Sequence, residues 1–344
     1  MKNNIVNSEY VKKQDIVVVV RNGSRNLIGK HALLTSIPHN PSVIGAFMTG
    51  IRSSDNQFIE TLLNTEQFKR EINKNLGATI NQITTSQFKK MRFHFSKQKE
   101  NKQIGVLFTY LDNSINLHER KCEELALIKK ALLQKLFPKK DEFKPKVRYK
   151  NFSDAWEQRK LGEVGKTQSG IGFPNKEQGG HQGIPFFKVS DMNNEGNEFE
   201  MKISNNYVTE IQITNRKWKP ISGVPAVIFA KVGAALMLNR KRLVKVPFLI
   251  DNNTMAYIFN KKWDPYFGKI LFDTLNLPRY AQIGALPSFN GSDIENIKVM
   301  LPNLEEQQML SQFFQNIDSL ITLHQRKLEK LKQLKKFLLQ NMFI

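Results

Sequence analysis

Apolar residues recur at helical spacing in two long stretches of the chain, residues 99–137 and 303–344. This period is typical of amphipathic α-helices. A helix of about forty residues is ~60 Å long, more than one small domain can cover. We therefore predict that the two helices pair with one another as an intramolecular coiled coil, either parallel or antiparallel. The residues expected at their interface are Leu111, Ile115, Leu125, Ile128 and Leu132 in the first stretch, and Ile317, Ile321, Leu328, Leu331 and Leu338 in the second.

The two stretches are copies of one another. Residues 111–137 align without a gap with residues 317–343, at an offset of 206 positions, and 14 of these 27 positions are identical. His118 and His324 occupy matching positions in the repeat. A metal site is one interpretation of these histidines, but polar residues that fix the helix register explain them better.

The remaining sequence predicts two globular α/β parts, so the fold class is α+β. The β-branched run at residues 15–20 is typical of a buried strand, and a helix over 56–75 and a short strand over 91–95 are expected after it. We predict a partial first domain at 1–98, the first helix at 99–137, a linker at 138–150, a second domain at 151–302 and the second helix at 303–344.

The duplication extends weakly into the globular parts. A strand, a basic loop, a helix, a Gly-Ala turn, a strand and a long helix recur in the same order, with the turns at residues 77–81 and 284–290. About seventy residues precede the basic loop in the second domain but only about twenty in the first. We therefore expect the first domain to lack its N-terminal part, and to expose apolar surface unless another chain covers it.

The net charge of +21 indicates a polyanionic partner, with nucleic acid as the first choice and an anionic membrane as the second. Arginine and lysine bind phosphates or guanine edges, and asparagine binds adenine. Ordinary basic hairpin turns remain an alternative explanation of these loops. The DNA-binding candidates are Arg21, Asn22, Ser24, Arg25, Asn26, Lys30, Lys188, Lys231, Asn239, Arg240, Lys241 and Arg242.

The sequence offers no catalytic, metal or cofactor site. Cys122 is the single cysteine, which excludes a disulfide framework. The pattern from Gly23 to Lys30 differs from a P-loop, because five residues instead of four separate its glycines and His31 stands where Ser or Thr should be. No apolar signal segment or membrane span is apparent, so we expect a cytoplasmic protein that does not bind membranes.

The motifs together resemble the specificity subunit of Type I restriction-modification systems. The resemblance rests on WEQRKLGE at Trp156–Glu163, on LPNLEEQQ at Leu301–Gln308, and on the repeated helical tract. It covers the whole chain, although the first target-recognition domain is shorter than the family pattern.

The resemblance implies a non-catalytic subunit whose two target-recognition domains read the two halves of a bipartite site on double-stranded DNA. Two methyltransferase subunits would dock on its helical spacer, and motor-nuclease subunits would join them. S-adenosylmethionine, ATP and magnesium would belong to these partners, with no cofactor in this chain. One alternative remains open, in which a truncated chain binds methyltransferase subunits through its helices without recognising specific DNA.

Overall fold

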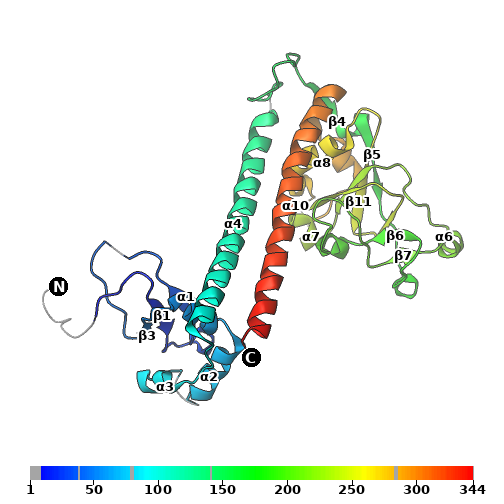
Figure 1. Cartoon of the computed structure of the whole chain (residues 1–344). Coiled ribbons are helices and arrows are strands. Elements are labelled where there is room, and N and C mark those ends of the chain that lie inside the picture. Colours follow the sequence, from blue (N-terminus) through cyan, green and yellow to red (C-terminus); the bar gives the residue numbers. More distant parts are fainter. Residues whose placement is uncertain (1–8, 38, 78–80, 140–141, 283–285, 344) are drawn as a thin grey trace. The chain divides into compact units, whose positions relative to one another are not determined.

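A computed structural model (Figure 1) describes residues 9–37, 39–77, 81–139, 142–282 and 286–343. The chain forms two compact units. Unit 1 comprises Met1–Glu124 and Ile321–Ile344, and unit 2 comprises Leu125–Leu320. The long helices α4 (Gln98–Leu136) and α10 (Leu304–Asn341) each contribute to both units. The predicted α+β fold, with two globular parts and two long helices, is confirmed.

Unit 1 is built on a three-stranded antiparallel sheet with the strand order β2-β1-β3. The inward face of β1 and the helices beside the sheet form one core cluster, which includes Ile16, Val18, Phe68 and Ile72. The elements before α4 are β1 (Ile16–Val19), η1 (Arg25–Leu27), β2 (His31–Leu33), β3 (Met48–Ile51), α1 (Asn56–Leu63), α2 (Glu66–Asn75) and α3 (Thr85–Lys90).

The single helix expected over residues 56–75 is instead two helices, so that prediction was wrong. The chain breaks at Asn64 and Thr65. The Thr65 hydroxyl accepts a hydrogen bond from the backbone N–H of Phe68 and donates one to the carbonyl oxygen of Leu62. A threonine that caps the next helix in this way ends the preceding one, because its side chain competes with the helical backbone bonds.

Unit 2 contains a four-stranded antiparallel sheet, β5-β11-β8-β9, beside two smaller sheets, β10-β6-β7 and β12-β4. Its strands are β4 (Glu157–Lys160), β5 (Gly165–Ser169), β6 (Ile184–Phe187), β7 (Tyr207–Val208), β8 (Ala226–Ala230), β9 (Lys241–Val244), β10 (Leu249–Ile250), β11 (Thr254–Phe259) and β12 (Lys298–Leu301). Its helices besides α4 and α10 are α5 (Leu161–Val164), η2 (Asn175–Glu177), η3 (Val189–Asn193), α6 (Glu210–Arg216), α7 (Ala234–Met237), α8 (Pro265–Thr274), η4 (Leu277–Tyr280) and α9 (Gly291–Glu295).

The two units share a sheet topology. The order β2-β1-β3 in unit 1 corresponds to β9-β8-β11 in unit 2, and the registers agree, since Ile16 pairs with Ile51 as Ala226 pairs with Ile258. Unit 2 adds β5 on the free edge of β11, and among the described residues no strand takes that place beside β3. The duplication therefore includes the sheet as well as the helices.

The strand expected over residues 91–95 is absent, and that prediction was wrong. At the offset of 206, residues 92–95 correspond to β12, which pairs with β4 in unit 2. A strand needs a hydrogen-bonded neighbour, and the described part of unit 1 supplies none here. The Gly-Ala turns of the repeat cannot be compared, because residues 78–80 and 283–285 lie outside the described residues.

The helices pair antiparallel in each unit, which decides between the two orientations left open by the sequence. In unit 1 the Lys335 ammonium lies 2.5 Å from the Asp112 carboxylate. In unit 2 the Lys129 ammonium lies 2.6 Å from the Asp318 carboxylate. The offset of 206 converts one of these ion pairs into the other, so both copies of the repeat use the same register.

The residues expected at the helix interface differ in burial. Leu111, Ile115 and Ile317 are more than nine-tenths buried, whereas Ile128 keeps 49% of its surface exposed. Ile128 therefore lies away from the packed side of its helix. The other six predicted interface positions are half-buried, namely Leu125, Leu132, Ile321, Leu328, Leu331 and Leu338.

His118 and His324 meet in unit 1, with their Nδ1 atoms 2.7 Å apart. One Nδ1 must carry a hydrogen and the other must accept it, so the contact requires at least one neutral imidazole. Partial burial, followed by the positive charges of His324 and Lys327, lowers the pKa of His118 below its ordinary value of 6.5. No group of three or more potential metal ligands occurs among the described residues.

The histidine pair predicts that unit 1 loses stability in mild acid. Between the lowered pKa of His118 and 6.5, the folded chain binds fewer protons than the unfolded chain. Its free energy of unfolding should therefore fall as the pH drops through 6.5. Urea unfolding between pH 5 and 8 would measure this fall, and a His118→Asn/His324→Asn variant should lose that part of it. An unchanged pH profile in the variant would contradict the prediction.

Candidate nucleic-acid interface

The two basic loops occupy equivalent hairpin connections. The first joins β1 to β2 through η1, and the second joins β8 to β9 through α7. A short helical turn therefore stands at the tip of each connection. The bridge from Arg21 to Gln82 in unit 1 matches the bridge from Val232 to Ser288 in unit 2, which anchors both loops at their first residues.

The candidates in unit 1 are accessible to solvent. Arg25 and Asn26 lie on η1, and Arg21 places its guanidinium 5.1 Å from the ring centroid of Phe47. The Asn22 side chain accepts a hydrogen bond from the backbone N–H of Ser24, which holds the turn. Arg21, Ser24, Arg25, Asn26 and Lys30 are exposed, and Asn22 is half-buried.

In unit 2 three candidates remain at least partly accessible. The Lys188 ammonium donates to the Gln178 side chain at 3.2 Å, and Arg240 donates to the Asn193 side chain. Lys231 directly follows β8 and is half-buried. Amide oxygens are neutral partners, so they leave the positive charges of Lys188 and Arg240 available to an anion.

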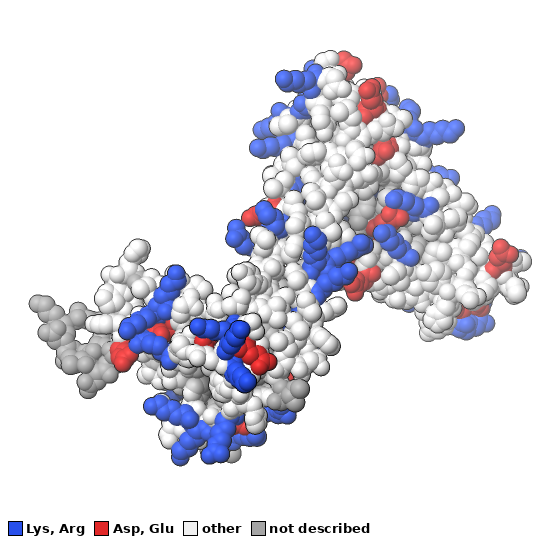
Figure 2. All heavy atoms as spheres, viewed as in Figure 1, with Lys and Arg blue, Asp and Glu red and all other residues white. Residues whose placement is uncertain are grey.

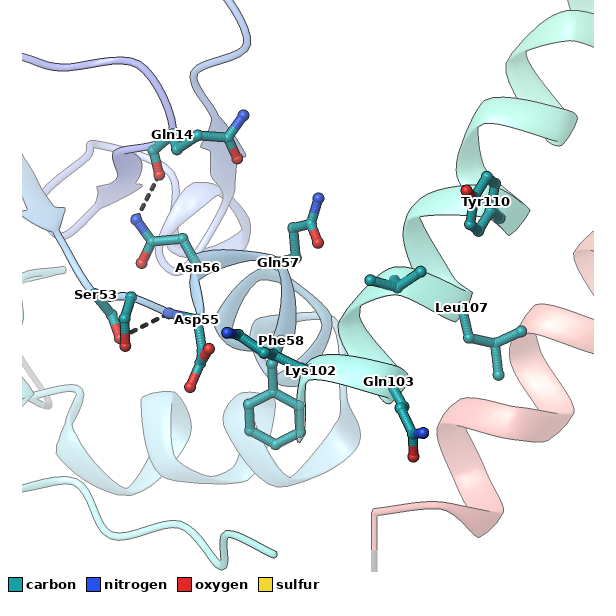
Figure 3. Close-up of a pocket in the computed structure, with 12 residues that line it drawn as sticks. Gln14, Ser53, Asp55, Asn56, Gln57, Phe58, Lys102, Gln103, Leu107 and Tyr110 are labelled. Carbon is teal, nitrogen blue, oxygen red and sulfur yellow. Dashed lines mark hydrogen bonds between the residues drawn. The ribbon is translucent and has the colours of Figure 1, made fainter. Parts of the chain in front are cut away.

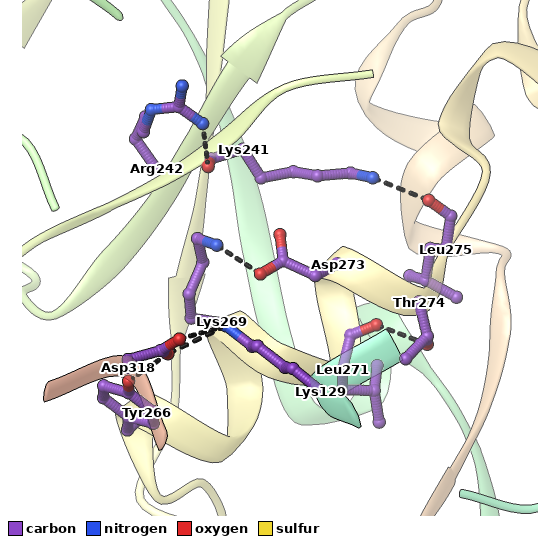
Figure 4. Close-up of polar contacts among 10 residues, drawn as sticks. All are labelled: Lys129, Lys241, Arg242, Tyr266, Lys269, Leu271, Asp273, Thr274, Leu275 and Asp318. Carbon is purple, nitrogen blue, oxygen red and sulfur yellow. Dashed lines mark hydrogen bonds and ion pairs between the residues drawn. The ribbon is translucent and has the colours of Figure 1, made fainter. Parts of the chain in front are cut away.

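The other three candidates in unit 2 maintain the fold, and Figure 4 shows two of them, Lys241 and Arg242. Lys241 is only 2% exposed, and its ammonium donates to the carbonyl oxygen of Leu275 at 2.6 Å. Arg242 donates to the carbonyl oxygens of Met192 and Lys241. Asn239, at φ +52°, donates to the carbonyl oxygen of Leu275 and accepts from the N–H of Leu277. Asn239 and Lys241 thus connect the start of β9 to the segment after α8, and Arg242 connects β9 to η3.

Burial changes the acid–base properties of this cluster. It lowers the pKa of Lys241 to about 8, with the nearby Asp273 carboxylate opposing the shift. Burial also lowers the pKa of Arg242 and of Lys269, whose ammonium pairs with Asp273 at 2.5 Å. The free energy needed to desolvate these cations is offset by carbonyl and carboxylate partners.

Most of this polar network could not be predicted from the sequence. Tyr266 donates its hydroxyl hydrogen to Asp318, which also accepts from Lys129. Lys129 and Asp318 lie in the repeat, so their matched positions were the only available signal. Lys269 and Asp273 are four residues apart on α8, a spacing that is equally common on exposed helices.

Two basic grooves correspond to each other through the repeat. One lies in unit 2, with a volume of about 780 Å³, and the other in unit 1, with about 420 Å³. Both are lined by the same four positions of the long helices, Lys130, Leu133, Gln134 and Phe137 in unit 2 and Lys336, Leu339, Gln340 and Phe343 in unit 1. Further cations line each groove, Lys139, Arg279 and Lys298 in unit 2, and Lys69, Arg70, Lys332 and Lys335 in unit 1.

In the view of Figure 2, lysine and arginine side chains are scattered over both units and interleaved with acidic ones. No single basic patch dominates this face. Positive charge is thus available to a polyanion at several places on each unit.

Comparison with known proteins decides the family. The family described as "Type I restriction modification DNA specificity domain" matches residues 3–127 and 153–333. The chain belongs to this family. It is a non-catalytic DNA-recognition subunit of a type I restriction-modification system, as the sequence resemblance predicted.

Curated relatives of this specificity subunit include three from Methanocaldococcus jannaschii. The MjaVIII specificity subunit is 24% identical, over 96% of this chain and 79% of its own length. The MjaIX specificity subunit is 23% identical, over 76% of this chain and 62% of its own length. The putative MjaX specificity subunit is 24% identical, over 78% of this chain and 60% of its own length.

Solved structures share the fold. The S subunit of a type I restriction-modification system from M. genitalium matches with a TM-score of 0.66 at 15% identity, over 98% of this chain and 84% of that one. A chain from a study of complex assembly and conformational transition in a type I system matches with a TM-score of 0.56 at 15% identity, over 97% of this chain and 83% of that one. In the described part of the specificity subunit, no helix is long and apolar enough to cross a membrane.

Neighbouring cations in the second basic loop should respond differently to removal. Lys241→Ala leaves a cavity and removes one of the two donors to the carbonyl oxygen of Leu275, so the free energy of unfolding of unit 2 should fall by about 1–3 kcal/mol. Arg240→Ala removes a more accessible side chain and should change it by less than about 0.5 kcal/mol. Urea denaturation of both variants would test this, and equal losses would show that the structural assignment of Lys241 is wrong.

Proposed function

We propose that each unit contacts one half of a bipartite DNA site through its hairpin loop. The observation that carries this proposal is the presence of equivalent basic loops on equivalent strands of the two units. The proposed contacts are Arg21, Asn22, Ser24, Arg25, Asn26 and Lys30 in unit 1, and Lys188, Lys231 and Arg240 in unit 2. Asn239, Lys241 and Arg242 are left out because the protein itself uses their side chains.

The division into domains belongs to the same proposal. Residues 1–98 and 151–302 would be the two target-recognition domains, 138–150 the linker, and 99–137 and 303–344 the spacer helices. The groove cations that make no ion pair among the described residues would bind backbone phosphates, since they present charge without a fixed pattern of base-directed donors. These are Lys130, Lys139, Arg279 and Lys298 in unit 2, and Arg70 and Lys336 in unit 1, because Lys69, Lys332 and Lys335 are paired with carboxylates.

We further propose that the spacer helices dock two methyltransferase subunits. Both helices expose large apolar side chains at matching positions of the repeat. Leu117 and Leu323 are 52% and 47% exposed, and Ile128 and Leu334 are 49% and 45% exposed. Two equivalent exposed sets suit two copies of one partner. Motor-nuclease subunits would join this core in the cytoplasm, and the partners would carry S-adenosylmethionine, ATP and magnesium.

The DNA-reading proposal can be tested by co-expressing the chain with its methyltransferase subunit in a host without other adenine methylation, and mapping the methylated bases. We expect a motif of two short defined halves around an unspecified gap. Arg240→Ala should relax the specificity at one position of one half if Arg240 contacts a base, and weaken methylation of all sites alike if it contacts a phosphate. A stable complex that methylates no DNA would support the sequestering alternative and contradict the proposal.

The docking proposal predicts the stoichiometry of the complex. Ile128→Glu and Leu334→Glu place a charge at matching positions of the two apolar sets, so each variant should retain only one methyltransferase subunit and the double variant none. Native mass spectrometry of the purified complexes would count the subunits. Glu substitution at Ile211, which is 72% exposed on α6, is the matched control and should retain two. Two bound subunits in every variant would rule out this surface.

A further inference from the structure

One edge of the sheet in unit 1 is free, whereas the equivalent edge of the sheet in unit 2 is covered by a further strand. In unit 2, β5 pairs with β11 along its length, and the residues Thr254–Ile258 of β11 are buried. The corresponding strand in unit 1, β3, has a free edge among the described residues, and Met48 is 46% exposed. Unpaired N–H and C=O groups on an edge strand are a template for another strand.

A second segment of unit 1 also lacks its partner. In unit 2, Val299 and Leu301 of β12 are 4% and 6% exposed because β4 pairs alongside. At the repeat offset their counterparts are Phe93 and Phe95, and Phe95 is 55% exposed. Both places where unit 1 lacks a strand thus correspond to strands of the continuous segment from β4 to β5 in unit 2.

The aromatic clusters of the two units differ in their third ring. In unit 2, Phe137 stacks on Phe267 at 5.5 Å, and Trp156 packs against both rings at 5.8 and 6.0 Å. In unit 1, Phe343 stacks on Phe58 at 5.7 Å in the same manner, and the partly exposed ring of Phe95 packs against Phe58 at 5.6 Å. No tryptophan takes the place of Trp156 in the described part of unit 1, since all three tryptophans of the chain lie in unit 2.

A groove marks where the incoming chain would run. In unit 2, Arg148 makes a bidentate ion pair with the buried Glu306, and Asn151 contacts Met309. At the repeat offset, the counterparts in unit 1 are Glu100, which is exposed, and Gln103, which lines a groove of about 610 Å³.

The groove lies between the start of α1 and the side of α4 (Figure 3), where α4 exposes Leu107 and Tyr110. On the α1 side, the buried Oδ1 atoms of Asp55 and Asn56 have no hydrogen-bond partner among the described residues. Exposed apolar side chains along a groove suit a bound polypeptide, which brings apolar groups of its own.

We propose that unit 1 binds a strand–turn–strand segment supplied by a second polypeptide. The segment would resemble residues 148–169 of this chain, with a cation to pair with Glu100, a tryptophan to pack against the exposed face of Phe95, one strand for residues 92–95 and one for β3. This surface accepts a specific segment by strand addition, and the inference does not depend on the proposed DNA contacts.

A second copy of this chain is a poorer donor. Its own segment is already engaged in unit 2, where Trp156 is 2% exposed and Leu161 and Val164 are fully buried. Releasing it would expose that apolar surface and break the pairing of both β4 and β5. A separate polypeptide could bind without exposing this apolar surface or breaking these strand pairs.

The test uses the full chain and a synthetic peptide of residues 143–169 as the probe. Amide hydrogen exchange should slow at residues 48–51 and 92–95 when the peptide is added, with binding in the micromolar range. A peptide with Trp156→Ala and Arg148→Glu should give little protection. In the full chain, Phe95→Ala should weaken binding about tenfold, whereas Ile211→Ala, an exposed control in unit 2, should leave it unchanged.

Three results would overturn the proposal. The first is unchanged exchange at 48–51 and 92–95 with saturating peptide. The second is altered exchange in unit 2 alone, which would mean that the peptide only competes with the segment already there. The third is a dimer of the full chain that already protects these residues without peptide, which would make a second copy the occupant.

Discussion

The register of the antiparallel helices is the constraint on which both halves of the molecule depend. Asp112 with Lys335 in unit 1, and Lys129 with Asp318 in unit 2, are the same contact made twice by a repeated sequence. A parallel pairing could not form both contacts. Each ion pair is partly buried, so it favours the correct register more than an exposed pair would, since a shifted helix would leave charges desolvated and unpaired.

Positive charge in this chain has two separate uses, which composition cannot distinguish. In unit 2, Lys241 and Lys269 are almost completely buried, and they hold β9, α8 and the segment after it together. Helix α1 of unit 1 corresponds to α8 of unit 2. At the position of Lys269, α1 has Glu60, whose carboxylate lies near His31. Burial raises the pKa of Glu60, so its ionisation would oppose folding. The accessible cations, such as Arg25 and Arg240, are the ones that we propose to contact DNA.

The two units contain the same three-stranded arrangement, and unit 2 adds a fourth strand to it. The strand order and registers agree, yet β11 of unit 2 is buried, whereas its counterpart β3 in unit 1 is half-exposed. The difference lies in what covers the free edge, as the pairing of β5 in unit 2 demonstrates. The edge of β3 combines unpaired backbone groups with the exposed side chain of Met48, so it is a stronger candidate for a partner than apolar exposure alone.

The sequence by itself determined the α+β class and the two long helices, because helical periodicity and a repeat of identical residues survive in a one-dimensional pattern. The family and its non-catalytic role came from the resemblance of the motifs at residues 156–163 and 301–308 and of the repeated helical tract. Tertiary structure decided what depends on partners distant along the chain. The burial of Lys241 requires the carbonyl oxygen of Leu275, and the loss of a strand at 91–95 follows from a missing neighbour. The antiparallel direction also emerged only from contacts. A local pattern shows what a side chain can do, whereas its surroundings decide whether it is buried in the protein or faces solvent.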